Sequence, residues 1–167
     1  VAVIRVGAPS EAELKNLNEA FDDAISATKA AAAEGIVPGC GLTLLRAIDE
    51  LEAEEQVVEG DERTGIQILK RALEEPTRQI AINSDVDDGV VVDRMRSGVG
   101  NYGFDAAKEE YGDRVAKVII DPTMVVRIGL ENAVSVASTL LLTEATLTTI
   151  PETKSDEPHM AGGVPQY

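Results

Sequence analysis

The first long stretch of periodic apolar positions predicts an amphipathic helix over about residues 11–33. Its apolar positions fall three or four residues apart, at Leu14, Leu17, Phe21, Ala24, Ile25 and Thr28. Ser10 and Glu13 have the spacing of a capping box, and Gly35 is placed to end the helix. Residues 1–6 are rich in Val and Ile and alternate weakly, which predicts a short strand before the helix.

The next segment predicts two or three more helices. One is expected from residue 42 to about residue 55, and another begins at Thr64 as its cap. Pro76 either kinks this helix or starts a new one that ends near Asn83. Residues 49–63 carry eight acidic side chains and one basic one, so this part is expected to be a solvated helix end and loop.

The pattern after residue 84 is less regular. Residues 85–88 form an acidic turn, and 89–96 fit a helix or a strand equally well. A glycine-rich loop over 98–103 is expected to lead into a short helix at 105–111. Residues 115–120 fit either a strand or a buried apolar turn.

The last part predicts a long apolar helix. Asp121 is a good N-cap and Pro122 suits the first helical position. The helix expected at 123–142 is apolar on most sides, so it is predicted to lie at the centre of the fold. A strand is expected at 146–150, followed by a flexible tail over 151–167.

Composition narrows the classes of protein. The formal charge is −15 and the pI is about 4.4, which weighs against nucleic acid and against an anionic membrane surface as partners. Arg127 and Glu131 interrupt the apolar helix, so no membrane span is expected. One Cys and one His exclude a disulfide framework and a Cys/His zinc cage within one chain. The N-terminus has no Met, and the chain is expected to be a fragment of a longer one.

A glycine pattern offers one functional hypothesis. Gly98, Gly100 and Gly103 match G-x-G-x-x-G, and Asp121 follows about twenty residues later, where a Rossmann fold places its ribose carboxylate. Gly112, however, limits the following helix to about two turns, which is short for a crossover of a βαβ unit. A dinucleotide-binding domain of an oxidoreductase is nevertheless kept as an alternative function for the chain.

Other polar residues have a structural and a functional interpretation. Asp22 and Asp23 lie off the apolar stripe of the first helix, as solvated carboxylates or as groups presented to another domain. The elbow Gly39-Cys40-Gly41 suits a helix–helix turn or a close approach of backbone to a ligand. Cys40 has no catalytic partner in view, because the single His, His159, lies in the tail.

Several motifs in order resemble the C-terminal part of group I chaperonins, the GroEL type. The most specific is Asn101-Tyr-Gly-Phe-Asp-Ala-Ala-Lys-Glu-Glu-Tyr-Gly112, followed by Ile120-Asp-Pro-Thr123. The resemblance covers nearly the whole chain and also includes residues 1–8, 22–24, 27–31, 34–39, 71–73, 76 and 78–80.

This resemblance implies a mainly α fold, an equatorial-type helical bundle with short strands near both ends. Residues 1–34 would end the intermediate domain, residues 35–150 would form the C-terminal half of the equatorial ATP-binding domain, and 151–167 would be the tail. The cofactors implied are ATP and Mg²⁺. The partners implied are identical subunits in a ring of seven, stacked in pairs, a co-chaperonin of GroES type and unfolded client proteins, in a bacterial cytoplasm or an organelle matrix.

The resemblance also assigns roles residue by residue. Asp23 matches the Asp that positions the attacking water, and Asp121 matches the carboxylate that meets the ribose. The remaining nucleotide-binding positions are Gly39, Cys40, Gly41, Asp105, Ala106 and Ala107. Cys40 departs from the family's middle glycine, and Asp105 stands where Asn is common.

No Asp-Gly-Thr-Thr phosphate motif occurs in the chain, and no metal ligand is predicted in it. The main phosphate and magnesium ligands are expected upstream, so the chain alone is expected to lack ATPase activity. A role as an assembly or interaction module alone remains open at this stage.

Overall fold

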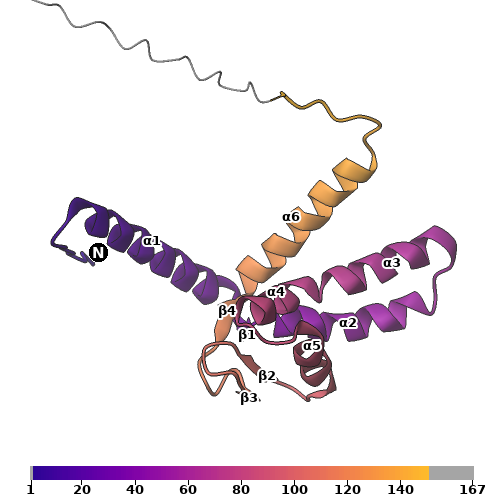
Figure 1. Cartoon of the computed structure of the whole chain (residues 1–167), viewed down its shortest axis with the longest axis horizontal. Helices are drawn as coiled ribbons and strands as arrows, with labels where there is room; N and C mark the ends of the chain where they lie inside the picture. Colours follow the sequence, from indigo (N-terminus) through magenta and orange to yellow (C-terminus); the bar gives the residue numbers. More distant parts are fainter. Residues whose placement is uncertain (1, 151–167) are drawn as a thin grey trace, which may run out of the picture.

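The computed structural model describes residues 2–150, and these form a mainly helical chain, as predicted (Figure 1). The elements in order are α1 (Glu11–Glu34), β1 (Ile36–Pro38), α2 (Leu42–Glu55), α3 (Gly60–Ala72), α4 (Glu75–Asn83), α5 (Asp88–Ser97), β2 (Tyr102–Asp105), β3 (Glu110–Asp113), β4 (Ile120–Pro122) and α6 (Thr123–Leu141). The tail predicted for 151–167 lies outside the described residues.

Helix α1 begins and ends where its sequence predicts. The Ser10 hydroxyl accepts a hydrogen bond from the Glu13 N–H at 3.3 Å. Gly35 adopts a φ of 84° and its N–H donates to the Ala31 carbonyl at 2.8 Å. A left-handed backbone after the last turn favours glycine, and here it turns the chain sharply into β1.

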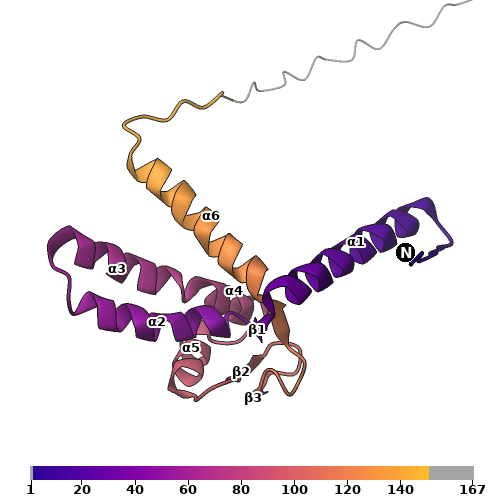
Figure 2. The ribbon, with the colours of Figure 1, turned by 180° about the vertical axis from the view of Figure 1, so that it is seen from behind.

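The core of the described chain is small and lies between α2, the end of α3, α4, α5 and β2. In α2, Leu42, Leu45 and Ile48 recur every three residues and are at most 1% exposed. They pack with buried residues of the neighbouring elements: Leu73, Ala81, Val91, Val92, Met95 and Phe104. Helices α2 and α3 run side by side away from this core in both views (Figures 1 and 2).

Interactions at the helix N-termini determine where the helices in the middle of the chain begin. Pro76 lies in the first turn of a new helix, α4, which ends at Asn83 as predicted. The Asp87 carboxylate accepts from the Val90 N–H at 2.8 Å, so the ambiguous segment after it is helix α5. The prediction that Thr64 caps α3 is wrong. The helix begins at Gly60, and the Thr64 hydroxyl donates to the Gly60 carbonyl inside the helix at 3.3 Å.

The short helix expected at 105–111 is also wrong, because this segment belongs to an antiparallel hairpin. Tyr102 lies opposite Asp113 in the register of β2 and β3. Across the two strands, the Phe104 and Tyr111 rings lie 5.3 Å apart at their centroids, and Tyr102 stacks on Tyr111 at 6.0 Å. Cross-strand aromatic packing therefore outweighs the helix-forming composition of the turn between the strands.

The second two-stranded sheet pairs β1 with β4, with Val37 opposite Asp121. Asp121 is consequently a strand residue, and the prediction that it caps α6 is wrong. Pro122 occupies the cap position, without a side-chain hydrogen bond. The apolar segment before β4 is a turn in which Val118 has a φ of 58°, so the strand alternative holds only from Ile120.

Helix α6 forms where predicted, but it does not lie at the centre of this chain. None of its residues is buried, and α1 and α6 diverge from the β1–β4 sheet (Figures 1 and 2). Its contacts in the described chain are chiefly with the end of α1 and with β4, which leaves much of its apolar surface uncovered. Among the described helices, α6 alone is long and apolar enough to cross a membrane by length and composition, which is weak evidence by itself.

Two predicted strands are absent from the described residues. The chain over 2–6 and 146–150 is neither strand nor helix. A strand exists only with a hydrogen-bonded partner, and these two segments pair with nothing in residues 2–150. The strands that do form lie instead at 36–38 and 120–122 and in the hairpin.

Candidate functional site

The glycine elbow between β1 and α2 is fixed from two sides. The Gly39 N–H donates to the Ile119 carbonyl at 3.0 Å, and a Cβ at Gly39 would lie only 3.2 Å from that same oxygen. Gly41 has a φ of 73°, and a Cβ there would overlap the Thr77 hydroxyl. The elbow therefore requires glycine at position 41, where α4 approaches closely, and a side chain at position 39 would press on the backbone of Ile119 just before β4.

The turn of the β2–β3 hairpin faces this elbow. Asp105 is 6% exposed, and its carboxylate accepts from the Ala107 N–H at 3.2 Å. The Ala106 N–H lies against the Cys40 thiol. The structure thus brings the predicted residues of the elbow together with those of the hairpin turn, about 65 residues later in the chain.

Asp121 completes the cluster from β4. Electrostatically, both Asp105 and Asp121 act on the Cys40 thiol, so the three side chains share one environment. Burial raises the pKa of the Asp121 carboxyl and also raises the pKa of Cys40. The elbow, the hairpin turn and β4 therefore share one partly desolvated environment.

Arg114 is a member of this region that the sequence did not indicate. It is fully buried, and its Nε donates to the Gly112 carbonyl at 3.1 Å, while Nη1 and Nη2 have no hydrogen-bond partner among the described residues. A Cβ at Gly103 would lie 3.1 Å from the Arg114 Cγ. The glycine of β2 that faces Gly112 thus leaves room for the arginine, a signal visible only once the hairpin register is known.

Asp23 lies apart from this cluster. It is exposed on α1, 12 residues before Gly35, which corresponds to about 18 Å along the helix axis. Asp22 is exposed beside it. The structure therefore brings together seven of the eight predicted site residues and leaves Asp23 on the projecting helix (Figure 1).

An ion pair joins the end of α1 to α6 beside Gly35. Arg127 donates to both carboxylate oxygens of Glu34, at 2.6 and 3.1 Å, and to Glu131 at 2.9 Å. The hydrogen bonds from Arg127 lower the pKa of Glu34 below its ordinary value of 4.5. A backbone hydrogen bond supports the same contact. The N–H of Thr123, four residues before Arg127, donates to the carbonyl of Gly35, which follows Glu34, at 3.1 Å.

This pair predicts an acid-dependent release of α1 from α6. Because the Glu34 pKa is lowered in the folded chain, its contribution is present above about 4.5 and is lost as the pH falls through the lowered value. Spin labels on α1 and α6 should report a wider distance distribution below that pH. Arg127→Met should give the wide distribution at every pH, and an equal pH response in that variant would contradict the assignment.

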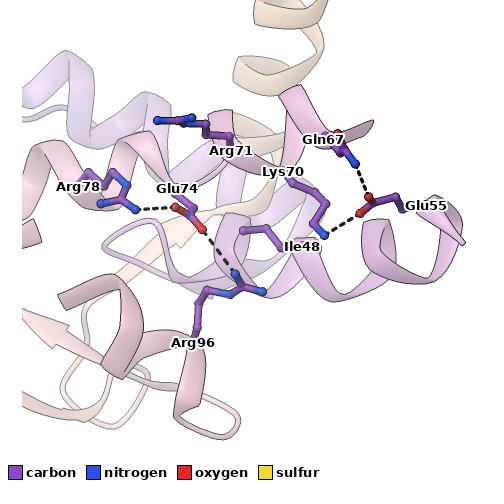
Figure 3. A pocket seen from close by; sticks show the side chains of 8 residues that line it. All are labelled: Ile48, Glu55, Gln67, Lys70, Arg71, Glu74, Arg78 and Arg96. Carbon is purple, nitrogen blue, oxygen red and sulfur yellow. Dashed lines mark hydrogen bonds and ion pairs between the residues drawn. The ribbon is translucent and has the colours of Figure 1, made fainter. Parts of the chain in front are cut away.

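A cavity of about 450 Å³ lies elsewhere, between α2, α3, α4 and α5 (Figure 3). Its charged groups are largely paired: Lys70 contacts Glu55 at 2.9 Å, and Glu74 contacts Arg78 at 2.7 Å. Hydrogen bonds from Gln67 and Lys70 lower the pKa of Glu55 to about 2. The arrangement is an ion-pair network that joins four helices, and none of the predicted site residues lines it.

The glycine pattern at 98–103 does not form a dinucleotide site. Gly98 ends helix α5, Gly100 lies in a loop with a φ of 62°, and Gly103 belongs to an antiparallel strand. Within residues 2–150 both sheets are two-stranded and antiparallel. A Rossmann fingerprint requires a parallel strand that leads through these glycines into a helix, so the oxidoreductase alternative is wrong.

A helical body with a glycine elbow facing a hairpin turn agrees with one known class of protein. The chain matches the TCP-1/cpn60 chaperonin family over residues 1–151 and belongs to that family. It is 65% identical over 164 residues to chaperonin GroEL 5 of Bradyrhizobium diazoefficiens, with 96% of this chain and 30% of that protein covered. It also resembles a group III chaperonin in the open state, with a TM-score of 0.78, 25% identity and coverage of 85% of this chain and 30% of the other.

The chain therefore spans about a third of the length of the curated relative that it matches. The resemblance drawn from the sequence motifs is confirmed at the level of the family and the fold.

Proposed function

We propose that this chain is the C-terminal part of an ATP-dependent ring chaperonin, called the intact protein below, and that it supplies part of the adenosine pocket and the hydrolytic Asp. The observation that carries the proposal is the convergence of the elbow at 39–41, the hairpin turn at 105–107 and Asp121. These three segments are far apart in sequence and share one partly desolvated environment. In this role Asp121 accepts from the ribose hydroxyls, and the glycines admit the nucleotide close to the backbone.

The residues present suit the nucleoside better than the phosphates. Glycine backbone and two carboxylates offer close approach and hydrogen-bond acceptors, but carboxylates repel phosphate. Among residues 2–150, no group of three or more His, Cys, Asp or Glu side chains could hold a metal ion. We expect the magnesium and phosphate ligands in the remaining length of the intact protein. When bound, Mg²⁺ would neutralise the phosphate charge there.

The proposed domain boundaries are those that the resemblance to the family implies. Residues 1–34 would end an intermediate domain, 35–150 would form half of an equatorial domain, and 151–167 would be a flexible tail. The rest of the equatorial domain would cover α6, on which six apolar residues are 40% to 84% exposed: Val125, Ile128, Val134, Val136, Leu140 and Leu141. This coverage would place α6 at the centre of the complete domain and would make it a core helix rather than a membrane span.

The assembly proposed is a ring of identical subunits, seven to a ring and stacked in pairs, working with a co-chaperonin of GroES type on unfolded client proteins. Its place is a bacterial cytoplasm or an organelle matrix. In such a ring, 146–150 would find its missing partner strand in a neighbouring subunit.

A ligand comparison tests the proposal. ATP with Mg²⁺ should raise the melting temperature of the intact protein, with a stabilisation of about 2.7 kcal/mol when the ligand exceeds its dissociation constant 100-fold. NAD at equal concentration should leave it unchanged, and the chain of 167 residues alone should hydrolyse no ATP. An intact protein that ATP does not stabilise would overturn the proposal.

A further inference from the structure

Thr77 is a buried hydroxyl residue that contacts the glycine elbow from helix α4. It lies in the first turn of α4 and is 2% exposed. Its hydroxyl donates to the Cys40 carbonyl, 37 residues earlier in the chain, at 3.1 Å. Among residues 2–150 this is the only hydrogen bond that the Cys40 carbonyl accepts. Buried polar groups are nearly always hydrogen-bonded, and here the contact satisfies the hydroxyl and the carbonyl together.

The elbow contains two consecutive residues in the left-handed region of backbone conformation. The φ of Cys40 is 60° and that of Gly41 is 73°. Glycine adopts this conformation readily, whereas a residue with a Cβ is strained in it. Position 40 therefore carries the strain of the elbow, and a strained backbone persists only where its surroundings fix it.

Contacts on both sides of Cys40 supply this support. The Gly39 N–H donates to the Ile119 carbonyl at 3.0 Å, which is a backbone contact and requires no particular side chain. On the other side, a Cβ at Gly41 would overlap the Thr77 hydroxyl oxygen and lie 3.1 Å from the Thr77 backbone nitrogen. Within the described chain, Thr77 is the only side chain that donates a hydrogen bond to residues 39–41. Its hydroxyl is thus the specific contact between α4 and the elbow.

The same hydrogen bond orients the peptide group between Cys40 and Gly41. The C=O and N–H of a trans peptide point to opposite sides. Because the Cys40 C=O points to α4, the Gly41 N–H points away from α4, and it has no hydrogen-bond partner among residues 2–150. Thr77 therefore determines the direction in which the elbow presents its backbone groups.

We propose that Thr77 is a positioning residue of the adenosine pocket, whose hydroxyl holds the Cys40–Gly41 peptide in the left-handed conformation that admits the nucleotide. It acts through the elbow and does not touch the nucleotide. This inference rests on the proposed function of the same pocket. It adds to the pocket a residue of α4 to which the resemblance assigns no role.

The hydroxyl acts by favouring one conformation of the elbow. Without it, Cys40 should relax toward a negative φ, which turns the 40–41 peptide and moves the backbone relative to the hairpin turn. Only the molecules that keep the left-handed elbow would bind nucleotide, so the apparent Kd should increase by the inverse of their fraction. Glycine at position 40 has no preference for negative φ, so the same loss should then have little effect.

The test measures ATP binding and ATP turnover of the intact protein. Thr77→Val removes the hydroxyl and keeps the shape of the side chain, so ATP should bind at least about fivefold more weakly, the scale of one net hydrogen bond. Turnover at saturating ATP should stay within about twofold of the wild type, because bound nucleotide selects the left-handed elbow. Thr77→Ser restores the hydroxyl donor and should restore the affinity to within about twofold.

A second comparison combines Thr77→Val with Cys40→Gly. In the Cys40→Gly background, Thr77→Val should change the ATP affinity by less than about twofold, against at least about fivefold when Cys40 is present. This coupling is specific to a positioning role at the elbow. A hydroxyl that only stabilised α4 would cost the same affinity in both backgrounds.

Ser84→Ala is the matched control for a general loss of stability. The Ser84 hydroxyl donates to the Ile80 carbonyl at 2.9 Å and lies at the other end of α4, also partly buried. Ser84→Ala thus deletes a comparable hydrogen bond from the same helix and should leave the ATP affinity unchanged. Partial unfolding would lower the turnover per molecule without changing KM, whereas the expected effect of Thr77→Val is on KM.

The outcomes separate this inference from the proposed function. If the wild-type protein binds no ATP, the proposed function fails. If it binds ATP and Thr77→Val binds it equally well, or if Thr77→Ser is as weak as Thr77→Val, the role of Thr77 is overturned. An equal loss of affinity with and without Cys40→Gly also overturns it. Should Thr77→Val alone not assemble, Thr77→Ser against the wild type and the double variant against Cys40→Gly decide by the same criteria.

Discussion

Replacing Asp23 by alanine in the intact protein is expected to reduce ATP turnover by roughly 10²-fold or more, the usual scale for losing a positioned base. ATP affinity and ring assembly should persist, because the Asp23 side chain is exposed on α1 and lies apart from the pocket residues. Single-turnover hydrolysis and nucleotide binding, measured on the same preparation, separate the chemical step from binding.

Asp22→Ala is the internal control. Asp22 is one residue away, about 100° round the helix, and is also exposed. A solvated carboxylate is ordinarily replaceable, within about ±0.5 kcal/mol of stability, so this variant should hydrolyse ATP normally. Normal turnover in Asp23→Ala would show that Asp23 is a solvated side chain, and greater damage in Asp22→Ala would show that the role is assigned to the wrong residue.

The position of Asp23 also implies a movement. Asp23 lies about 18 Å along the axis of α1 from Gly35. Gly35 is the residue that leads from α1 into β1 and the elbow. For Asp23 to reach a nucleotide at the elbow, α1 must rotate about the left-handed Gly35. The Glu34–Arg127 pair lies beside this pivot and holds α1 in the position observed. The acid-release experiment and the turnover experiment thus examine two parts of one motion.

The sequence predicted those elements that are fixed by neighbouring residues. Helix α1 depends on a hydroxyl cap three residues from its N–H partner, and α4 has a proline in its first turn. The segment 89–96 stays open between helix and strand unless Asp87 is taken as the N-cap of α5, which it is in the structure. Local hydrogen bonds of this kind can be read from the spacing of residues along the chain.

The sequence alone could not predict the hairpin, because its stability comes from across the strands. Phe104 and Tyr111 are seven residues apart and meet only in the antiparallel register. Asp121 was misassigned for a similar reason. Its pairing with Val37, 84 residues earlier, holds it in a strand that no neighbouring residue indicates.

The candidate site was predictable by resemblance rather than by chemistry. The distances along the sequence between the elbow, the hairpin turn and Asp121 do not predict that they lie together. The resemblance to the family identified them as one group. Arg114 was missed because a single arginine in a charged segment has no local signal. Its position becomes visible only in the folded chain, where it is fully buried and two of its nitrogens have no partner among residues 2–150.

Asp121→Ala should have the opposite signature to Asp23→Ala. A charged hydrogen bond contributes about 1.5–3 kcal/mol, so ATP affinity should fall roughly 10- to 100-fold. Turnover at saturating ATP should stay near that of the wild type. The fold should survive, because Asp121 pairs with Val37 through its backbone and its carboxylate accepts no hydrogen bond in the described structure.

Removing the ribose hydroxyl provides the matching control for Asp121. The wild-type protein should bind 2′-deoxy-ATP more weakly than ATP, whereas Asp121→Ala should bind the two nucleotides almost equally, as expected when both changes delete one interaction. Burial raises the pKa of Asp121 in the chain without nucleotide, and ionised Asp121 is the better acceptor, so the wild-type preference should weaken as the pH falls through this raised value. If Asp121→Ala discriminates between the two nucleotides as strongly as the wild type does, the ribose is held by another residue and the assignment of Asp121 is wrong.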